Sequence, residues 1–161
     1  MPGRRVSDEG PISIDPNYAD GYVQLGQTML YSGRFEESLQ LVKKGIRLCP
    51  KPRPFYPWSL GYAYFMLRRY EMAIATGKSL LERCQNGECP PEWARSILIA
   101  SYMEHGMEKE ARTEAQEVLK ARPTISLELY RRGHPYKDPA NLERLLSAWR
   151  KAGIPEHPPS K

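Results

Sequence analysis

The stretch PFYPWSLGYAYFMLRRYEMAIATGKSLLERCQ, from Pro54 to Gln85, decides the fold of this chain. Small and apolar residues recur in it mostly three or four positions apart, which places them along one face of a helix. The residues that form this pattern are Leu60, Gly61, Tyr64, Tyr70, Ala73, Gly77 and Leu80. The stretch therefore predicts a pair of helices.

The same pattern occurs before and after this stretch. Leu25, Leu60 and Leu98 occupy matching places, 35 and 38 residues apart, and such a period is typical of a helical repeat. The first unit has Tyr22, Leu25, Gly26, Met29, Phe35, Ser38, Val42, Gly45 and Pro50, with Gly33 interrupting the period. The third has Leu98, Ile99, Tyr102, Gly106, Ala111, Ala115, Val118 and Pro123. Small residues within the units predict close approach of two antiparallel helices.

Prolines and turn residues mark the unit boundaries. The run from Lys51 to Pro54 cannot continue a helix, so the second unit starts near Pro54. The connection QNGECPP, residues 85–91, is rich in turn residues and explains the longer second spacing. We therefore expect three units at about 19–52, 54–87 and 92–125.

Residues 17–124 resemble the tetratricopeptide repeat (TPR) family, whose period is about 34 residues. The resemblance implies an all-α, TPR-type helical repeat array. In such an array, antiparallel helix pairs form a right-handed superhelix and the first helices line a concave surface. The second unit departs from the family at Gly77 and at Gln85, which replaces the closing proline. The alternative is an unrelated six-helix bundle.

The two ends of the chain differ from the repeats. Residues 1–16 are expected to form an N-terminal tail, and Ile12 to Pro16 resembles the closing turn of a preceding repeat. This suggests a segment of a longer array, although a polar terminus of a free-standing protein is the alternative. At the other end, residues 126–154 are predicted to form a short helix and a capping helix, followed by a disordered tail at 155–161.

The capping helix is predicted from its start and stop residues. Asp138 is a good N-cap, Pro139 suits the first helical position, and Gly153 suits the end of a helix. Its apolar residues are Leu142, Leu145, Leu146 and Trp149. We expect this helix to cover the exposed core of the last unit, after a short helix near 126–132 and a turn at His134.

Residues 127–155 resemble the ends of TPR regions appended to bacterial class III adenylate or guanylate cyclases and to some transcriptional regulators. The run from Lys137 to Pro139 and the run from Leu142 to Leu146 carry this likeness. The resemblance implies a bacterial, cytoplasmic signalling protein with a catalytic or DNA-binding domain upstream. No such domain is visible in the sequence, so none of its catalytic residues is transferred.

The composition limits the partners that we expect. The net charge is +5, but the basic residues are spread along the chain without one long run, so we do not expect nucleic-acid binding. No apolar run is long enough for a membrane span or a signal peptide, which predicts a cytoplasmic protein without a membrane partner. In that compartment, Cys49, Cys84 and Cys89 are expected to be reduced thiols.

The sequence shows no pattern typical of a catalytic centre. It lacks the glycine-rich phosphate loops, and His105, His134 and His157 are far apart. We therefore expect no enzyme activity, no cofactor and no small-molecule substrate. Cys84 and Cys89 could meet as a redox pair or as two metal ligands, but structural zinc sites usually have four clear ligands, so we expect no metal site.

An aromatic stripe is the candidate site. Phe55, Trp58, Tyr62 and Phe65 follow one another at spacings of 3, 4 and 3 residues, on a helix face distinct from that of Leu60. The TPR resemblance places this face in the concave groove. The candidate groove residues are Val23, Gln27, Leu30, Phe55, Trp58, Tyr62, Phe65, Trp93, Ser96 and Met103. The alternative is that the capping helix or a second copy of the chain covers the stripe.

The leading hypothesis is a non-catalytic scaffold or regulatory module for protein–protein interaction, which binds a peptide or a helix in the groove. Tryptophan and tyrosine are good binding anchors because their rigid rings offer a large contact area. The first alternative is the regulatory or dimerisation region of a bacterial signalling enzyme such as a nucleotide cyclase. Under this alternative, the chain could form a homodimer. The second is nucleic-acid binding through the basic surface, which we do not expect.

Overall fold

The computed structural model describes residues 17–161, and all regular structure in this range is helical. The helices are α2 (Ala19–Tyr31), α3 (Phe35–Leu48), α4 (Phe55–Met66), α5 (Tyr70–Gln85), α6 (Pro91–Glu104), α7 (Glu108–Ala121), α8 (Leu127–Gly133) and α9 (Pro139–Ala152). The predicted all-α class is confirmed for these residues. The predicted tail at 1–16 and its preceding-repeat remnant lie outside the described residues.

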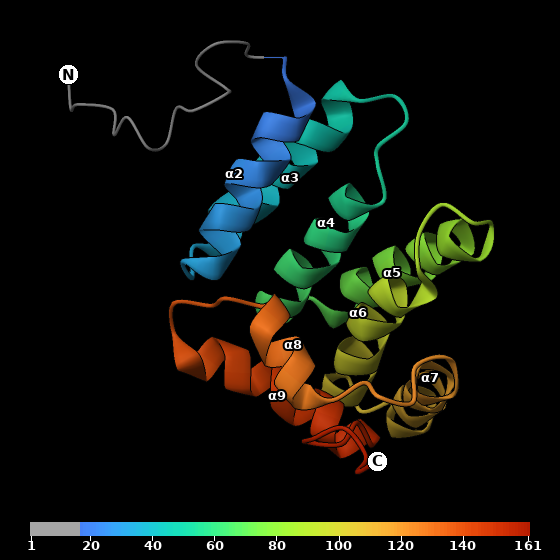
Figure 1. Ribbon diagram of the computed structural model, residues 1–161. Coiled ribbons are helices and arrows are strands. Elements are labelled where there is room, and N and C mark those ends of the chain that lie inside the picture. Colours follow the sequence, from blue (N-terminus) through green and yellow to red (C-terminus); the bar gives the residue numbers. More distant parts are fainter. Residues whose placement is uncertain (1–16) are drawn as a thin grey trace.

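Consecutive helices pack as pairs, and the pairs stack on one another. Helices α2 and α3, α4 and α5, and α6 and α7 form the pairs, and α5 also packs against α6 (Figure 1). The chain reverses within each pair at a residue with positive φ, namely Gly33 at 85°, Arg68 at 59° and Gly106 at 82°. Glycine reaches this conformation at no steric cost, whereas Arg68 adopts it against the preference of its side chain.

Glycines permit close contacts, but not all at the places predicted. A Cβ atom on Gly45 would lie 2.5 Å from Val23 Cγ2, at the contact of α2 with α3 as expected. A Cβ atom on Gly61 would instead lie 2.7 Å from Ile97 Cδ1, and one on Gly77 would lie 2.8 Å from a Leu98 side-chain atom. These last two glycines therefore admit α6 of the next pair, so their predicted role within the second pair is wrong.

Helix α9 begins and ends at the predicted residues, and α8 is shifted by one residue from its predicted range. The Ser126 side chain accepts a hydrogen bond from the backbone N–H of Leu129 at the start of α8. At the start of α9, Asp138 Oδ1 accepts one from the N–H of Ala140 at 2.9 Å. Gly153 ends α9 with a φ of 112°. Both caps satisfy backbone donors that have no partner within the helix.

The C-terminal segment, residues 126–154, covers more than the last helix pair. Helix α9 packs against α6 and α7, as predicted for a capping helix. The connection between α8 and α9 also reaches the end of α2, where the N–H of Lys137 donates to the carbonyl of Tyr31 at 2.8 Å. Figure 1 shows this segment lying across the stacked pairs. It buries Leu145, Leu146 and Trp149 in the main core.

Two of the cysteines differ from the prediction. A disulfide bond joins Cys84, near the end of α5, to Cys89 in the connection that follows. The prediction of reduced thiols is therefore wrong for this pair, while Cys49 remains a free thiol. The turn between them contains Gly87 with a φ of 91°, which brings the two cysteines together.

Candidate binding site

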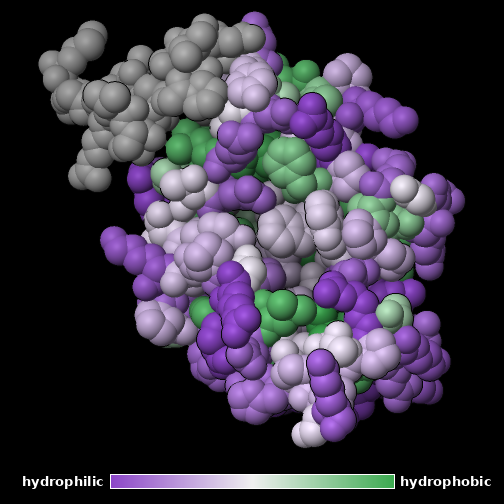
Figure 2. Space-filling model, viewed as in Figure 1, coloured by the Kyte–Doolittle hydropathy of each residue, from purple (hydrophilic) through white to green (hydrophobic). Residues whose placement is uncertain are grey.

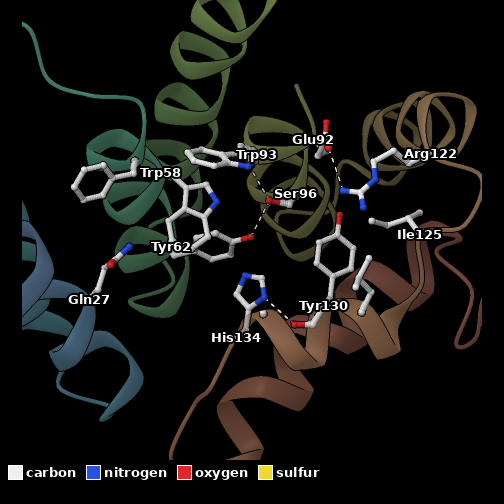
Figure 3. A pocket seen from close by; sticks show the side chains of 13 residues that line it. Gln27, Trp58, Tyr62, Glu92, Trp93, Ser96, Arg122, Ile125, Tyr130 and His134 are labelled. Atoms are coloured by element: carbon white, nitrogen blue, oxygen red, sulfur yellow. Dashed lines mark hydrogen bonds and ion pairs between the residues drawn. The ribbon is translucent and has the colours of Figure 1, made fainter. Parts of the chain in front are cut away.

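A pocket of about 410 Å³ lies between α4, α6 and α8, with Gln27 of α2 at one side. Figure 3 shows the labelled side chains of Trp58, Tyr62, Trp93 and His134 around one space. In the view of Figure 2, pale and green side chains gather at the centre of this face, and purple hydrophilic ones surround them. The full lining is Gln27, Phe55, Trp58, Tyr62, Glu92, Trp93, Ser96, Arg122, Ile125, Leu129, Tyr130, Gly133 and His134.

Helices α4 and α6 supply the aromatic wall. Phe55, Trp58 and Tyr62 lie three and four residues apart in α4, so they share one helix face. Trp93 and Ser96 lie three residues apart in α6 and face the same pocket. Because α4 and α6 pack side by side, the two short rows of side chains form one surface.

The rings of this wall are in contact with one another. The ring centroids of Trp58 and Tyr62 are 4.9 Å apart, and those of Trp58 and Trp93 are 6.2 Å apart. The centroid of Tyr62 is 5.2 Å from that of His134. Such edge and tilted contacts are the favourable geometries for aromatic pairs. The wall is therefore continuous from the rim at Trp93 to His134 in the C-terminal segment.

A chain of buried hydrogen bonds connects the residues at the floor of the pocket. The hydroxyl of Ser96 donates to the carbonyl of Trp93 at 2.8 Å, so the hydroxyl of Tyr62, 2.8 Å from Ser96 Oγ, must be the donor of that second bond. The indole N–H of Trp149 donates to the carbonyl of Ser96 at 2.8 Å. Burial raises the pKa of the Tyr62 hydroxyl well above its ordinary value. The floor is therefore uncharged, and its polar groups are paired with one another.

His134 is a neutral residue in the pocket wall. Its Nδ1 lies 2.9 Å from the carbonyl of Tyr130, which can only accept, so Nδ1 carries the proton. Burial lowers the pKa of the imidazole, because the protonated form loses its hydration. The Nε2 atom of His134 and the hydroxyl of Tyr130 are both buried and have no hydrogen-bond partner.

The charges at the rim cancel. Glu92 and Arg122 are the lining residues with formal charges, and they form an ion pair at 3.1 Å. The pocket therefore offers an incoming group no net charge.

The structure brings together part of the predicted groove. The predicted residues that line the pocket are Gln27, Phe55, Trp58, Tyr62, Trp93 and Ser96. Val23, Leu30 and Phe65 are fully buried and lie outside it. Met103 is half-buried and packs against the main core. The aromatic stripe is thus neither fully open nor fully covered.

Local packing explains the three buried positions. Val23 points towards Gly45 of α3, so it belongs to the contact inside the first pair. Phe65 lies under the guanidinium of Arg144 from α9. Leu30 is part of the main core with Leu39. The prediction that these three residues line an accessible groove wall is therefore wrong.

The C-terminal wall of the pocket is not predicted by the repeat pattern. Leu129, Tyr130 and His134 lie beyond the last repeat unit, and Ile125 lies at its very end, so the repeat period carries no signal for them. His134 is predicted as a turn residue; it does follow α8, but its ring is buried in the pocket wall. The ion pair of Arg122 with Glu92 at the rim also leaves no local signal in the sequence, since its two members are 30 residues apart.

No protein-family model matches the chain, and no curated protein sequence matches it. The likeness to TPR proteins therefore depends on the residues of the chain itself. Among residues 17–161, no group of three His, Cys, Asp or Glu side chains lies close enough together to hold a metal ion. No helix in the described range is long and apolar enough to cross a membrane.

Proposed function

We propose that this chain is a non-catalytic interaction module of the TPR type, and that it binds a peptide segment of a protein partner. The stacked helix pairs and the repeat spacing support the TPR assignment. The pocket between α4, α6 and α8 is the proposed binding site. A concave, largely apolar pocket with a few polar groups is the common form of a binding site.

The exposed apolar rim is the observation that carries this proposal. Trp93 is 38% exposed and Leu129 is 42% exposed, and they lie on different helices of the same pocket. Clusters of exposed large apolar side chains mark interaction sites more often than single exposed residues do. Trp93 in particular is of the residue type that most often acts as a binding anchor.

The state of the polar groups favours binding over catalysis. The hydroxyl of Ser96 is engaged with the carbonyl of Trp93 and the hydroxyl of Tyr62, so it has no base to activate it. His134 is held neutral by burial, with its Nδ1 proton on a backbone carbonyl. Glu92 is paired with Arg122. We therefore propose that these groups shape the pocket and do not take part in a reaction.

A selection from a random peptide display library tests the proposal. The wild-type chain is expected to enrich peptides with a common motif. Trp93→Ala should weaken their binding at least about tenfold, because it removes a rim anchor worth roughly 1.4 kcal/mol or more. Thermal unfolding should change little, since Trp93 is partly exposed.

The matched control is Met72→Ala. Met72 is 50% exposed on α5 and does not line the pocket, so this variant should bind the selected peptides like the wild type. If no peptide is enriched, or if Trp93→Ala binds the selected peptides as tightly as the wild type does, the pocket is not a peptide site.

A further inference from the structure

We infer that the pocket takes one uncharged aromatic side chain of the partner, presented by an extended peptide segment. This inference rests on the proposed function, and it names the chemistry of the group that enters.

The ring geometry does not form an aromatic cage for a cation. A cation held between two aromatic faces needs ring centroids roughly 8 Å or more apart, because it lies within about 6 Å of each centroid and over the ring face. The rings of Trp58 and Tyr62 are only 4.9 Å apart, and those of Trp58 and Trp93 are 6.2 Å apart. These rings fill the space between one another, so they form a wall and not a cage.

The charges disfavour any ion. A lysine or arginine side chain would need the carboxylate of Glu92, which already pairs with Arg122 at 3.1 Å. A carboxylate or phosphate would need Arg122, which is engaged by the same pair. Each ionic ligand would therefore break an existing ion pair and lose hydration, without a net charge in the pocket to compensate.

The form of the pocket favours an inserted side chain over a docked helix. A helix that binds in a groove uses several anchors, at positions such as i, i+4 and i+7, along a long apolar surface. The pocket is one space of about 410 Å³ with a closed floor, in which Tyr62 is 1% and Ser96 is 3% exposed. One ring can reach this floor from the rim at Trp93, while the peptide backbone stays outside.

The protein itself shows which side chain suits this wall. Trp149 of α9 packs against three residues that also line the pocket. Its ring stacks on that of Tyr130 with centroids 3.9 Å apart, and its centroid is 5.4 Å from that of His134. Its N–H donates to the carbonyl of Ser96. A partner's ring in the pocket would continue this series of aromatic contacts, from Trp149 through His134 and Tyr62 to the rim.

The test uses small amides as probes in place of an unidentified partner. The three tryptophans of the chain are replaced by 5-fluorotryptophan, which provides a separate fluorine NMR signal for Trp58, Trp93 and Trp149. N-acetyl-tryptophanamide and N-acetyl-phenylalaninamide should shift the signals of Trp58 and Trp93 saturably, with dissociation constants of about 1 mM. The signal of the buried Trp149 should move less.

Two further probes define the chemistry. N-acetyl-leucinamide and N-acetyl-lysinamide should bind at least about fivefold more weakly, because they lack the ring contacts or carry a charge. Trp58→Ala should weaken the binding of the aromatic amides by a similar factor, and Met72→Ala should leave it unchanged. Circular dichroism of Trp58→Ala checks its fold. Leu129→Ser, on the α8 side of the pocket, should also weaken the binding of the aromatic amides.

The outcomes separate this inference from the proposed function. The inference is overturned if no probe saturates up to about 20 mM, or if the leucine or lysine amide binds as tightly as the aromatic ones. If selected peptides bind through Trp93 but contain no aromatic residue, the proposed function stands and the inference fails. If the aromatic amides bind but no peptide is enriched, the aromatic site stands and the function proposed for it fails.

Discussion

Arg144 of α9 covers the ring of Phe65 in α4. The central carbon of its guanidinium lies 4.7 Å from the ring centroid. The same group donates to the carbonyl of Phe65 at 2.7 Å and to that of Met66 at 3.1 Å. These carbonyls belong to the last turn of α4, where partners within the helix are missing. The Arg144 side chain therefore caps α4 and covers the aromatic stripe at its Phe65 end.

Arg144→Met should lower the free energy of unfolding by about 2 kcal/mol, because it removes charge-assisted hydrogen bonds from partly buried carbonyls. Urea unfolding measures the loss. Lys151→Met, at an exposed position of the same helix, should change stability by less than about 0.5 kcal/mol. Equal stability of Arg144→Met and the wild type would mean that α9 does not cap α4.

Gly45→Ala should destabilise the first helix pair by roughly 1 to 3 kcal/mol. Its Cβ atom would lie 2.5 Å from Val23 Cγ2 and 2.9 Å from the backbone oxygen of Ala19, which cannot move without shifting α2. The control is Gly133→Ala, where the Cβ atom would have no neighbour within 4 Å. Thermal unfolding that ranks the two variants in the opposite order would contradict this contact.

His134 should make the protein less stable at low pH. Burial lowers the pKa of this imidazole in the folded chain, so the unfolded chain binds a proton more readily as the pH falls below about 6.5. Above that pH the imidazole does not lower the free energy of unfolding. Below it, the free energy of unfolding decreases by at most about 1.4 kcal/mol per pH unit. Urea unfolding at several pH values between 5 and 8 measures the slope.

Comparison with variants isolates this effect from the carboxylates. His134→Gln should show a shallower loss of stability on acidification than the wild type, whatever its stability at neutral pH. An unchanged slope in His134→Gln would show that His134 is not buried as a neutral ring.

The Cys84–Cys89 disulfide should be detectable by alkylation and mass spectrometry. The unreduced, unfolded protein should take up one alkyl group, at Cys49, whereas the reduced protein should take up three. Reduction should lower the free energy of unfolding by about 2 kcal/mol at most, because the bond closes a short loop. Uptake of three groups without reduction would show that the bond does not form.

Local patterns in the sequence were sufficient for the helices and for one side of the site. The period of the apolar residues places Trp58 and Tyr62 on one face, since side chains three or four positions apart share a helix face. The N-cap at Asp138 and the end at Gly153 are equally local, because each depends on backbone groups within one helical turn. For such features, the residues that interact are neighbours in the chain.

Tertiary structure alone decided which part of the aromatic stripe stays open. Arg144 covers Phe65 across 79 residues, and Trp149 reaches Ser96 across 53. Such contacts depend on the direction in which the chain leaves α7 and α8. The repeat period of the sequence does not encode this direction. The C-terminal segment, by returning across the helix pairs, fills one end of the predicted groove and adds Tyr130 and His134 as a new wall. The sequence by itself determined the aromatic face, whereas packing between distant residues turned part of that face into core and the rest into a pocket.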